Sequence, residues 1–197
     1  MCLRVLLFSL CVCTSCCELF AQPKRQFLDD IDRRYATSDA VMLESRESII
    51  IENDKDKGLQ IRSEHFHQVY FRGDNARLQA DEFIPFSTFN TVGNLQACYF
   101  EPRGKGFKKI PVETFKTIDN YSQSVFYDDS KAIRVVFPSV ARGGVSQLQY
   151  SETYSDPHIL GNFYFSSYMP VVESVVSLEF PVSVRVNYKI FNDRGDI

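Results

Sequence analysis

The stretch LQIRSEHFHQVYF, residues 59–71, decides the fold class of this 197-residue chain. Side chains of an extended chain point alternately to two faces. One face of this stretch carries apolar side chains at both ends and two imidazoles, His65 and His67, at its centre. The pattern therefore predicts a long β-strand whose apolar face also bears two histidines.

The same alternation recurs along much of the chain, between residues that favour turns. It is clearest at 176–180 and 182–190, on either side of Pro181. Proline has no backbone N–H, so we expect the chain to bend there or to pass to another sheet. Further strands are expected at 40–43, 48–52, 83–89, 95–101, 107–112 and 163–168.

Two local units complete the expected fold. Residues 133–137 and 148–154 are expected to form a hairpin with a long loop that turns at Gly143-Gly144. The lead-in at 22–34 is expected to be helical, because apolar side chains recur every four residues at Phe27, Ile31 and Tyr35. The fold class is therefore all-β and mainly antiparallel, a β-sandwich or open sheets with a short N-terminal helix.

Residues 1–21 have the pattern of a secretory signal peptide. Arg4 precedes an apolar run from Val5 to Val12, which is shorter than the about 20 residues that a transmembrane helix needs. We expect a mature chain that starts at Gln22, has no transmembrane segment, and is exported to the periplasm or cell envelope. Lipid anchoring at Cys16 or Cys17 is the alternative.

The positions of the cysteines and the balance of charge indicate which kinds of protein are excluded. Of the 6 cysteines only Cys98 lies beyond the leader, so the mature chain has no intrachain disulfide. The chain has 22 basic and 25 acidic residues with mixed signs, a net charge of −3. This balance gives no basic face for nucleic acid or for an anionic membrane.

His65 and His67 are the candidate metal ligands, because two imidazoles on one strand face can share an ion. A zinc site needs at least a third ligand, and no spacing in the sequence singles one out. The alternatives are a β-bulge that turns one ring outward, or neutral rings hydrogen-bonded in the interior. We therefore expect neither a metal nor a cofactor.

No catalytic residue is expected. Cys98 lies within an expected strand and reads as a small buried hydrophobe. Asp156-Pro157-His158 is expected to form a turn. Asp128-Asp129 is expected to be the exposed start of a strand. Arg194-Gly195-Asp196 is interpreted as a chance match to an integrin-binding tripeptide.

Aromatic residues supply the last candidate site. The chain holds 10 Tyr and 17 Phe, and most of them must fill the core. Tyr164 and Tyr168 are expected to share the exposed face of their strand, where they would form a contact patch for a peptide, a glycan or a neighbouring domain.

A set of short motifs also runs through the chain in order: Asp39-Ala40-Val41 after Tyr35, Gln96-Ala97 before Gly104, Phe137-Pro138 before Gly143-Gly144, Phe163-Tyr164-Phe165, and Pro170-Val171. In their order and spacing they resemble the DUF3857 family, over residues 35–192. The resemblance implies a β-rich module of exported bacterial proteins, usually placed before a transglutaminase-like domain, and similar in fold to the N-terminal domain of M1 aminopeptidases. It implies no catalytic residue, and a domain at 35–197.

The function expected from these observations is a non-catalytic exported module. Its partner would be a cell-envelope protein, or a transglutaminase-like or peptidase domain to which it is accessory. One alternative is the N-terminal part of a transglutaminase-like enzyme whose catalytic domain lies downstream. The other is a glycan- or metal-binding module.

Overall fold

The computed structural model describes residues 22–56, 58–119 and 130–192. Their elements, in chain order, are α1 (Arg25–Arg34), β1 (Ala40–Asp54), β2 (Gly58–Phe71), the 3-10 helix η1 (Asp74–Gln79), β3 (Asp81–Phe86), β4 (Asn90–Arg103), β5 (Gly106–Pro111), β6 (Lys116–Asp119), β7 (Lys131–Val136), β8 (Val145–Tyr154), the 3-10 helix η2 (Pro157–Ile159) and β9 (Val171–Glu179). The fold is therefore mostly β, as predicted. Within these ranges no helix has the length and apolar character needed to cross a membrane.

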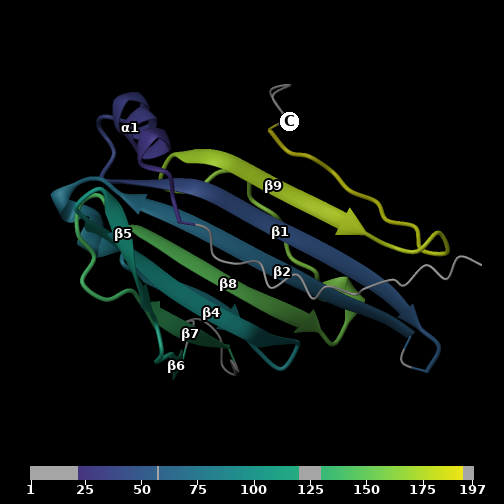
Figure 1. Ribbon diagram of the computed structural model, residues 1–197. Helices are drawn as coiled ribbons and strands as arrows, with labels where there is room; N and C mark the ends of the chain where they lie inside the picture. The colour runs from purple at the N-terminus through teal and green to yellow at the C-terminus, as the bar shows by residue number, and fades with distance from the viewer. Residues whose placement is uncertain (1–21, 57, 120–129, 193–197) are drawn as a thin grey trace, which may run out of the picture.

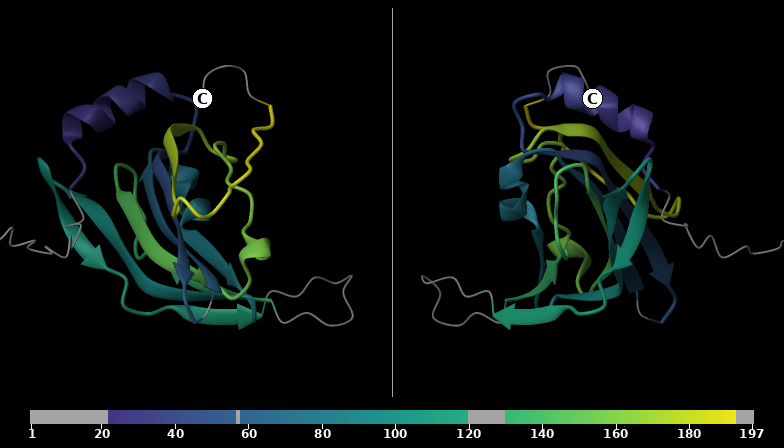
Figure 2. Two further views of the ribbon diagram at one scale, coloured as in Figure 1. Left: turned by 90° about the vertical axis from the view of Figure 1, so that its right-hand side faces the viewer. Right: turned by 60° about the vertical axis from the view of Figure 1, so that its left-hand side comes forward.

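The strands form two sheets. The larger has the order β5-β4-β8-β2-β1-β9, and the smaller has the order β3-β7-β6. All pairs are antiparallel except β1 with β9, which is parallel. Figure 1 shows the long strands of the larger sheet side by side, with α1 at the top and β6 and β7 at the bottom. The views in Figure 2 show how strongly the larger sheet curves.

Strands β1 and β2 form the long hairpin at the centre of the larger sheet. They pair from Ala40 opposite Phe71 to Asp54 opposite Gly58, with a register shift between Met42 and Glu44. The predicted strand at 59–71 is confirmed. The two separate strands predicted at 40–43 and 48–52 are one strand, because a bulge lets the chain bend without leaving its partner.

The two faces of this hairpin are covered by different elements. On one face, Val41 and Tyr70 pack with Leu28 and Ile31 of α1. On the other face, the core includes Ala40, Met42, Val69 and Phe71 with Ile84, Val135 and Phe137 from and beside the smaller sheet. The predicted N-terminal helix is confirmed.

The buried face of α1 differs from the predicted spacing. Leu28 and Ile31 are the buried side chains of this helix, whereas Phe27 is exposed and Tyr35 follows the helix as its C-cap residue. Side chains three and four apart share a helix face, so Leu28 takes the inward position that the four-residue spacing assigned to Phe27.

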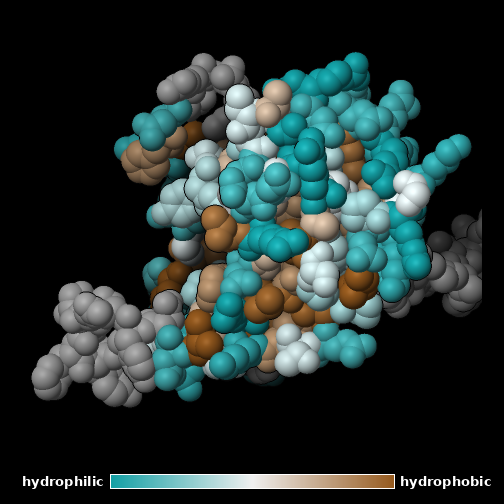
Figure 3. Space-filling view, turned by 90° about the vertical axis from the view of Figure 1, so that its left-hand side faces the viewer, coloured by the Kyte–Doolittle hydropathy of each residue, from teal (hydrophilic) through white to brown (hydrophobic). Residues whose placement is uncertain are grey.

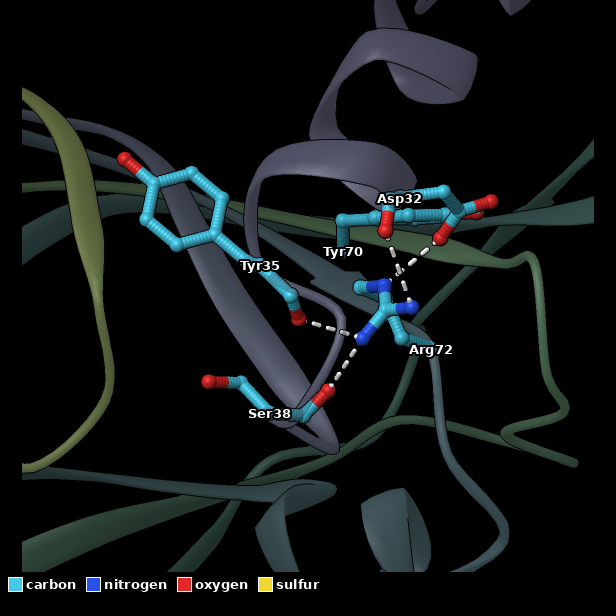
Figure 4. A network of polar contacts seen from close by, with 5 residues as sticks. All are labelled: Asp32, Tyr35, Ser38, Tyr70 and Arg72. Atoms are coloured by element: carbon cyan, nitrogen blue, oxygen red, sulfur yellow. Dashed lines mark hydrogen bonds and ion pairs between the residues drawn. The ribbon is translucent and has the colours of Figure 1, made fainter.

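Arg72, directly after β2, links α1 to the sheet through polar contacts (Figure 4). Its guanidinium donates to Asp32 Oδ1 at 2.6 Å and to the backbone oxygens of Tyr35 and Ser38 at 2.6 and 2.7 Å. The Tyr70 hydroxyl donates to Asp32 Oδ2 at 3.1 Å. One side chain thus donates hydrogen bonds to backbone carbonyls at the C-terminal end of α1 and in the turn after it, where helix carbonyls have no intrahelical partner.

The prediction that Gly143 and Gly144 turn a hairpin is wrong. The two glycines lie where the chain passes from one sheet to the other. Strand β7 pairs with β3 and β6, whereas β8 pairs with β2 and β4. Gly143 has φ +85°, and a Cβ on Gly144 would lie 1.8 Å from the Tyr99 hydroxyl oxygen. The two glycines are therefore required by backbone conformation and by close packing respectively.

Two predicted strands are absent from the ladders of the described chain. Residues 163–168 form no strand. Beyond β9, the Val184 N–H donates to the Pro181 oxygen at 2.9 Å, so the chain turns at Pro181 as expected, but 182–190 pairs with no strand. Instead, Val184 and Val186 pack on the cluster of Ile49, Ile51 and Ile61. Packing of these two partly buried side chains takes the place of ladder pairing.

Replacing Arg72 by methionine tests the α1 anchor. Methionine keeps the apolar stem and removes the donors, so we expect the free energy of unfolding to fall by about 2–3 kcal/mol. Partial exposure of Asp32, whose side chain is 42% exposed against 10% for Arg72, keeps the loss below that of a fully buried pair. Arg62→Met is the control, because Arg62 pairs with Glu64 at the surface, and its loss should cost about 0.5 kcal/mol or less. Equal losses in urea unfolding would contradict the anchor.

Replacing Gly144 by alanine tests the close approach to Tyr99. The added Cβ must displace the Tyr99 ring, and overpacking of this kind costs about 1–3 kcal/mol. Gly106→Ala is the matched control, since a Cβ there meets nothing within 4 Å. Thermal unfolding should separate the two variants. If Gly144→Ala melts like the control, the packing argument is wrong.

Candidate functional site

Polar side chains gather on the face of the larger sheet that also carries Val69 and Phe71. The strand register aligns them across β8, β2, β1 and β9 in three rows. In strand order, the rows are Leu148, His67, Ser45 and Ser174; Tyr150, His65, Glu47 and Val176; and Glu152, Ser63, Ile49 and Leu178. Both histidines thus share one face, as predicted.

His65 lies at the centre of a hydrogen-bonded group. Its Nε2 is 2.8 Å from Ser63 Oγ and 3.2 Å from Glu152 Oε2. Its ring stacks on Tyr150, with 4.5 Å between ring centroids and 9° between ring planes. These contacts confirm an interior, hydrogen-bonded imidazole.

Glu152 is the best-satisfied carboxylate of the group. The Tyr154 hydroxyl donates to its Oε2 at 2.7 Å, and the Asn90 amide donates to its Oε1 at 3.0 Å. Burial alone would raise the pKa of Glu152, but the hydrogen bonds from His65, Tyr154 and Asn90 outweigh it, and the pKa is lowered. Glu152 is therefore a buried, charged acceptor.

His67 lacks the hydrogen bonds that His65 makes. Its Nδ1 is buried and has no hydrogen-bond partner. Burial first, and then the charge of His65, lowers the pKa of His67 to about 4. The ring is therefore neutral at neutral pH, with one nitrogen that donates and one that accepts.

Two further carboxyl groups belong to this region. Burial raises the pKa of Glu47, against the opposing effect of His65. Burial also raises the pKa of Glu82 on β3 to about 7. Glu82 lies two residues before buried Ile84 and so faces inward, and its charge acts on Tyr150 and Tyr168, whose pKa values are raised mainly by burial.

A cavity of about 250 Å³ lies beside the histidines. Strands β1, β2 and β9 contribute Ser45, Glu47, His67 and Ser174 among its lining residues, and most of the remaining lining comes from 162–167. The Ser174 Oγ is buried and, like His67 Nδ1, has no hydrogen-bond partner.

Ser63, His65 and Glu152 do not form a proton relay. In such a relay the base contacts the nucleophile through one ring nitrogen and the orienting carboxylate through the other. Here Ser63 and Glu152 contact the same Nε2, and Ser63 is fully buried. The group therefore holds the imidazole in place without exposing a nucleophile.

The histidine pair also lacks the ligand set of a metal centre. Across the described ranges, no group of three or more His, Cys, Asp or Glu side chains has an arrangement that could hold an ion. His65 Nε2 is already engaged by Ser63 and Glu152.

Cys98 is buried in the core that contacts α1, and its thiol lies 3.9 Å from Gln147 Oε1. Burial raises the pKa of this thiol to about 11, so little thiolate forms at neutral pH. The prediction of a small buried hydrophobe is confirmed.

Tyr164 and Tyr168 lie in a connecting segment rather than on a strand, with 73% and 78% of each residue exposed. Tyr164 lines the cavity, whereas Tyr168 is not part of its lining. Both tyrosines are exposed, as predicted, but they lie in a connecting segment and not on a strand. Their role in contacts stays a prediction.

The remaining candidate residues lie either in a turn or outside the described ranges. Asp156 caps η2, where its Oδ1 accepts from the His158 backbone N–H at 2.8 Å, which confirms the turn. The residues 128–129 and 194–196 lie outside the described ranges.

The sequence patterns did not single out Glu47, Ser63, Glu82, Glu152 or Ser174. The alternation that put Leu148, Tyr150 and Tyr154 on one face also includes Glu152, so this residue could have been found. Glu82 and Ser174 required knowledge of which strands pair, and no local pattern carries that information.

Comparison with known proteins gives one family and one fold. The model of a family described as a domain of unknown function with a solved structure, DUF3857, matches residues 48–196. A crystal structure described as that of "a putative protease from Parabacteroides distasonis ATCC 8503" is similar, with a TM-score of 0.56 and 15% identity over 71% of this chain. The match spans 28% of that longer chain, and at this identity it shows the fold alone. No curated protein matches.

The raised pKa of Glu82 predicts how stability depends on pH. Between the unfolded value of about 4.3 and the folded value, the native state binds more protons, so the free energy of unfolding falls as pH rises. Glu82→Gln removes this loss and should gain roughly 1–3 kcal/mol over wild type between about pH 5 and about pH 8. The opposite contribution of His67 is common to both proteins and cancels in the difference.

Urea unfolding of wild type and Glu82→Gln at both pH values measures this difference. Glu64→Gln, which removes an exposed carboxylate paired with Arg62, is the control. A difference between Glu82→Gln and wild type that does not change with pH would show that Glu82 is solvated.

Proposed function

The chain belongs to the DUF3857 family, and on this premise we propose that it is a non-catalytic module that binds a peptidase-type or transglutaminase-like protein domain. We place its site of action outside the cytoplasm, on the pattern of residues 1–21. The family itself carries no assigned role, so the proposal depends on the surface of the described chain.

One observation carries the proposal: exposed large apolar side chains gather at the end of the described chain. Eight of the seventeen such side chains lie between residues 175 and 191. This apolar strip consists of Val175, Val176, Leu178, Phe180, Val182, Tyr188, Ile190 and Phe191. Exposed apolar side chains, aromatic rings above all, are enriched in protein-binding surfaces.

The face drawn in Figure 3 is mostly hydrophilic, and its hydrophobic residues show between polar ones. The strip also lies on and beyond β9, which is an edge strand of the larger sheet. An edge with apolar side chains is a surface that proteins normally cover.

The nature of the partner rests on the fold comparison. In the protein described as a putative protease, this fold corresponds to 28% of a longer chain. A module of this shape therefore occurs beside further protein, and Ser63 and Cys98 supply no accessible nucleophile of their own.

Site-specific crosslinking tests the proposal in the native cell. A photoreactive phenylalanine at Tyr188, which is 84% exposed, should capture a protein that contains a peptidase-type or transglutaminase-like domain. The control position is Leu78 on η1, which is 86% exposed and lies outside the strip. Val182→Asp, a change at a fully exposed side chain, should abolish the Tyr188 adduct without loss of folding.

Two outcomes would overturn the proposal. Equal labelling from Leu78 and Tyr188, or adducts only with a second copy of the chain, would remove the strip as a binding surface. Capture of a partner without such a domain would overturn the accessory role.

A further inference from the structure

The cavity beside His67 has the features of a binding site for a small group. It measures about 250 Å³, below the roughly 300–1,000 Å³ of pockets that hold drug-sized ligands. A single side chain or a comparably small molecule would fill it. None of the residues of the apolar strip lines it.

Two polar side-chain atoms of its lining residues lack hydrogen-bond partners. His67 Nδ1 on β2 and Ser174 Oγ on β9 are buried, and neither has a hydrogen bond. The register places them in one row, with Ser45 of β1 between them. Buried polar atoms are nearly always paired, so two orphans in one lining point to a partner that is not part of this chain.

The lining is rich in groups that accept hydrogen bonds or attract positive charge. Glu47 contributes a carboxylate, Ser45 and Ser174 contribute hydroxyl oxygens, and His67 is a neutral imidazole. Phe163 and Tyr164 contribute aromatic rings, whose faces attract cations.

Positive charge in the lining is already committed. Arg46 and His65 also border the cavity. The Arg46 guanidinium pairs with Glu44 at 3.4 Å and lies 5.1 Å from the centroid of the Phe66 ring, and His65 Nε2 lies 3.2 Å from Glu152 Oε2. The nearby Glu152 adds a second carboxylate to Glu47. The site therefore favours a cation over an anion.

We propose that this cavity binds a primary ammonium group, the chemistry shared by a lysine side chain, a peptide amino terminus and a free alkylamine. An ammonium group brings a positive charge for Glu47 and three N–H donors for the accepting atoms of the lining, such as the Ser174 hydroxyl oxygen. A quaternary ammonium has no donors and would leave the orphaned atoms unpaired. A sugar would supply donors without the positive charge that Glu47 attracts.

Titration followed by amide NMR on the full chain tests this assignment. Nα-acetyl-lysine N-methylamide is the lysine probe, alanyl-alanine amide is the amino-terminus probe, and n-butylamine is the free amine. At least one should bind with a dissociation constant of about 1 mM or tighter. Its shifts should centre on His67 and Ser174.

Matched probes and variants isolate the charge. Nα-acetyl-norleucine N-methylamide, the neutral isostere of the lysine probe, and methyl glucoside should not bind. Glu47→Gln keeps the size of the side chain and should weaken ammonium binding by roughly tenfold or more. Glu64→Gln is the control, because Glu64 pairs with Arg62 and does not line the cavity.

The proposal fails if the norleucine probe binds as tightly as the lysine probe, if only the glucoside binds, or if no amine gives saturable shifts. It also fails if Glu47→Gln binds like wild type. Should Glu47→Gln not fold, Ser174→Ala supplies the second test and must weaken binding. The crosslinking at Tyr188 does not depend on any of these results.

Discussion

Strand β2 sets the register on which the rest of the molecule depends. Both of its edges are paired, with β1 and with β8, and both faces of its C-terminal end are covered. Tyr70 packs toward α1, whereas Val69 and Phe71 pack toward the smaller sheet. A slip of one residue would exchange the two faces, so burial on both sides fixes the alternation.

That register has a cost at the middle of the strand. The face that buries Val69 and Phe71 also takes His65 and His67 out of water, and a buried polar group is unfavourable unless it is paired. Glu152 and Ser63 pair with His65. His67 Nδ1 has no such partner. The two histidines thus have the same place in the alternation but differ in hydrogen bonding, since His65 Nε2 has partners and His67 Nδ1 has none.

The sequence predicted the parts of this arrangement that depend on local periodicity. Side-chain alternation predicts the strand at 59–71, the all-β class and the shared face of His65 and His67, and a four-residue apolar spacing predicts the N-terminal helix. The hairpin at 133–154 was wrong because pairing partners depend on contacts between distant segments. The strand at 182–190 was wrong because Val184 and Val186, which are partly buried, pack against Ile49, Ile51 and Ile61 without a ladder. Alternation shows that a segment is suited to a strand, not that a neighbour is there to pair with it.

Strand direction explains why a cavity forms where it does. Strands β8 and β1 are both antiparallel to β2, and β9 is parallel to β1, so β8 and β9 run in the same direction. Two successive strands with the same direction need a connection that returns along the length of the sheet. Residues 155–170 make this return, and they bring Phe163 and Tyr164 to the lining that also holds His67 and Ser174. The cavity walls are therefore set by topology, while the hydrogen-bonding character of the cavity comes from the few polar side chains that the register turns toward it.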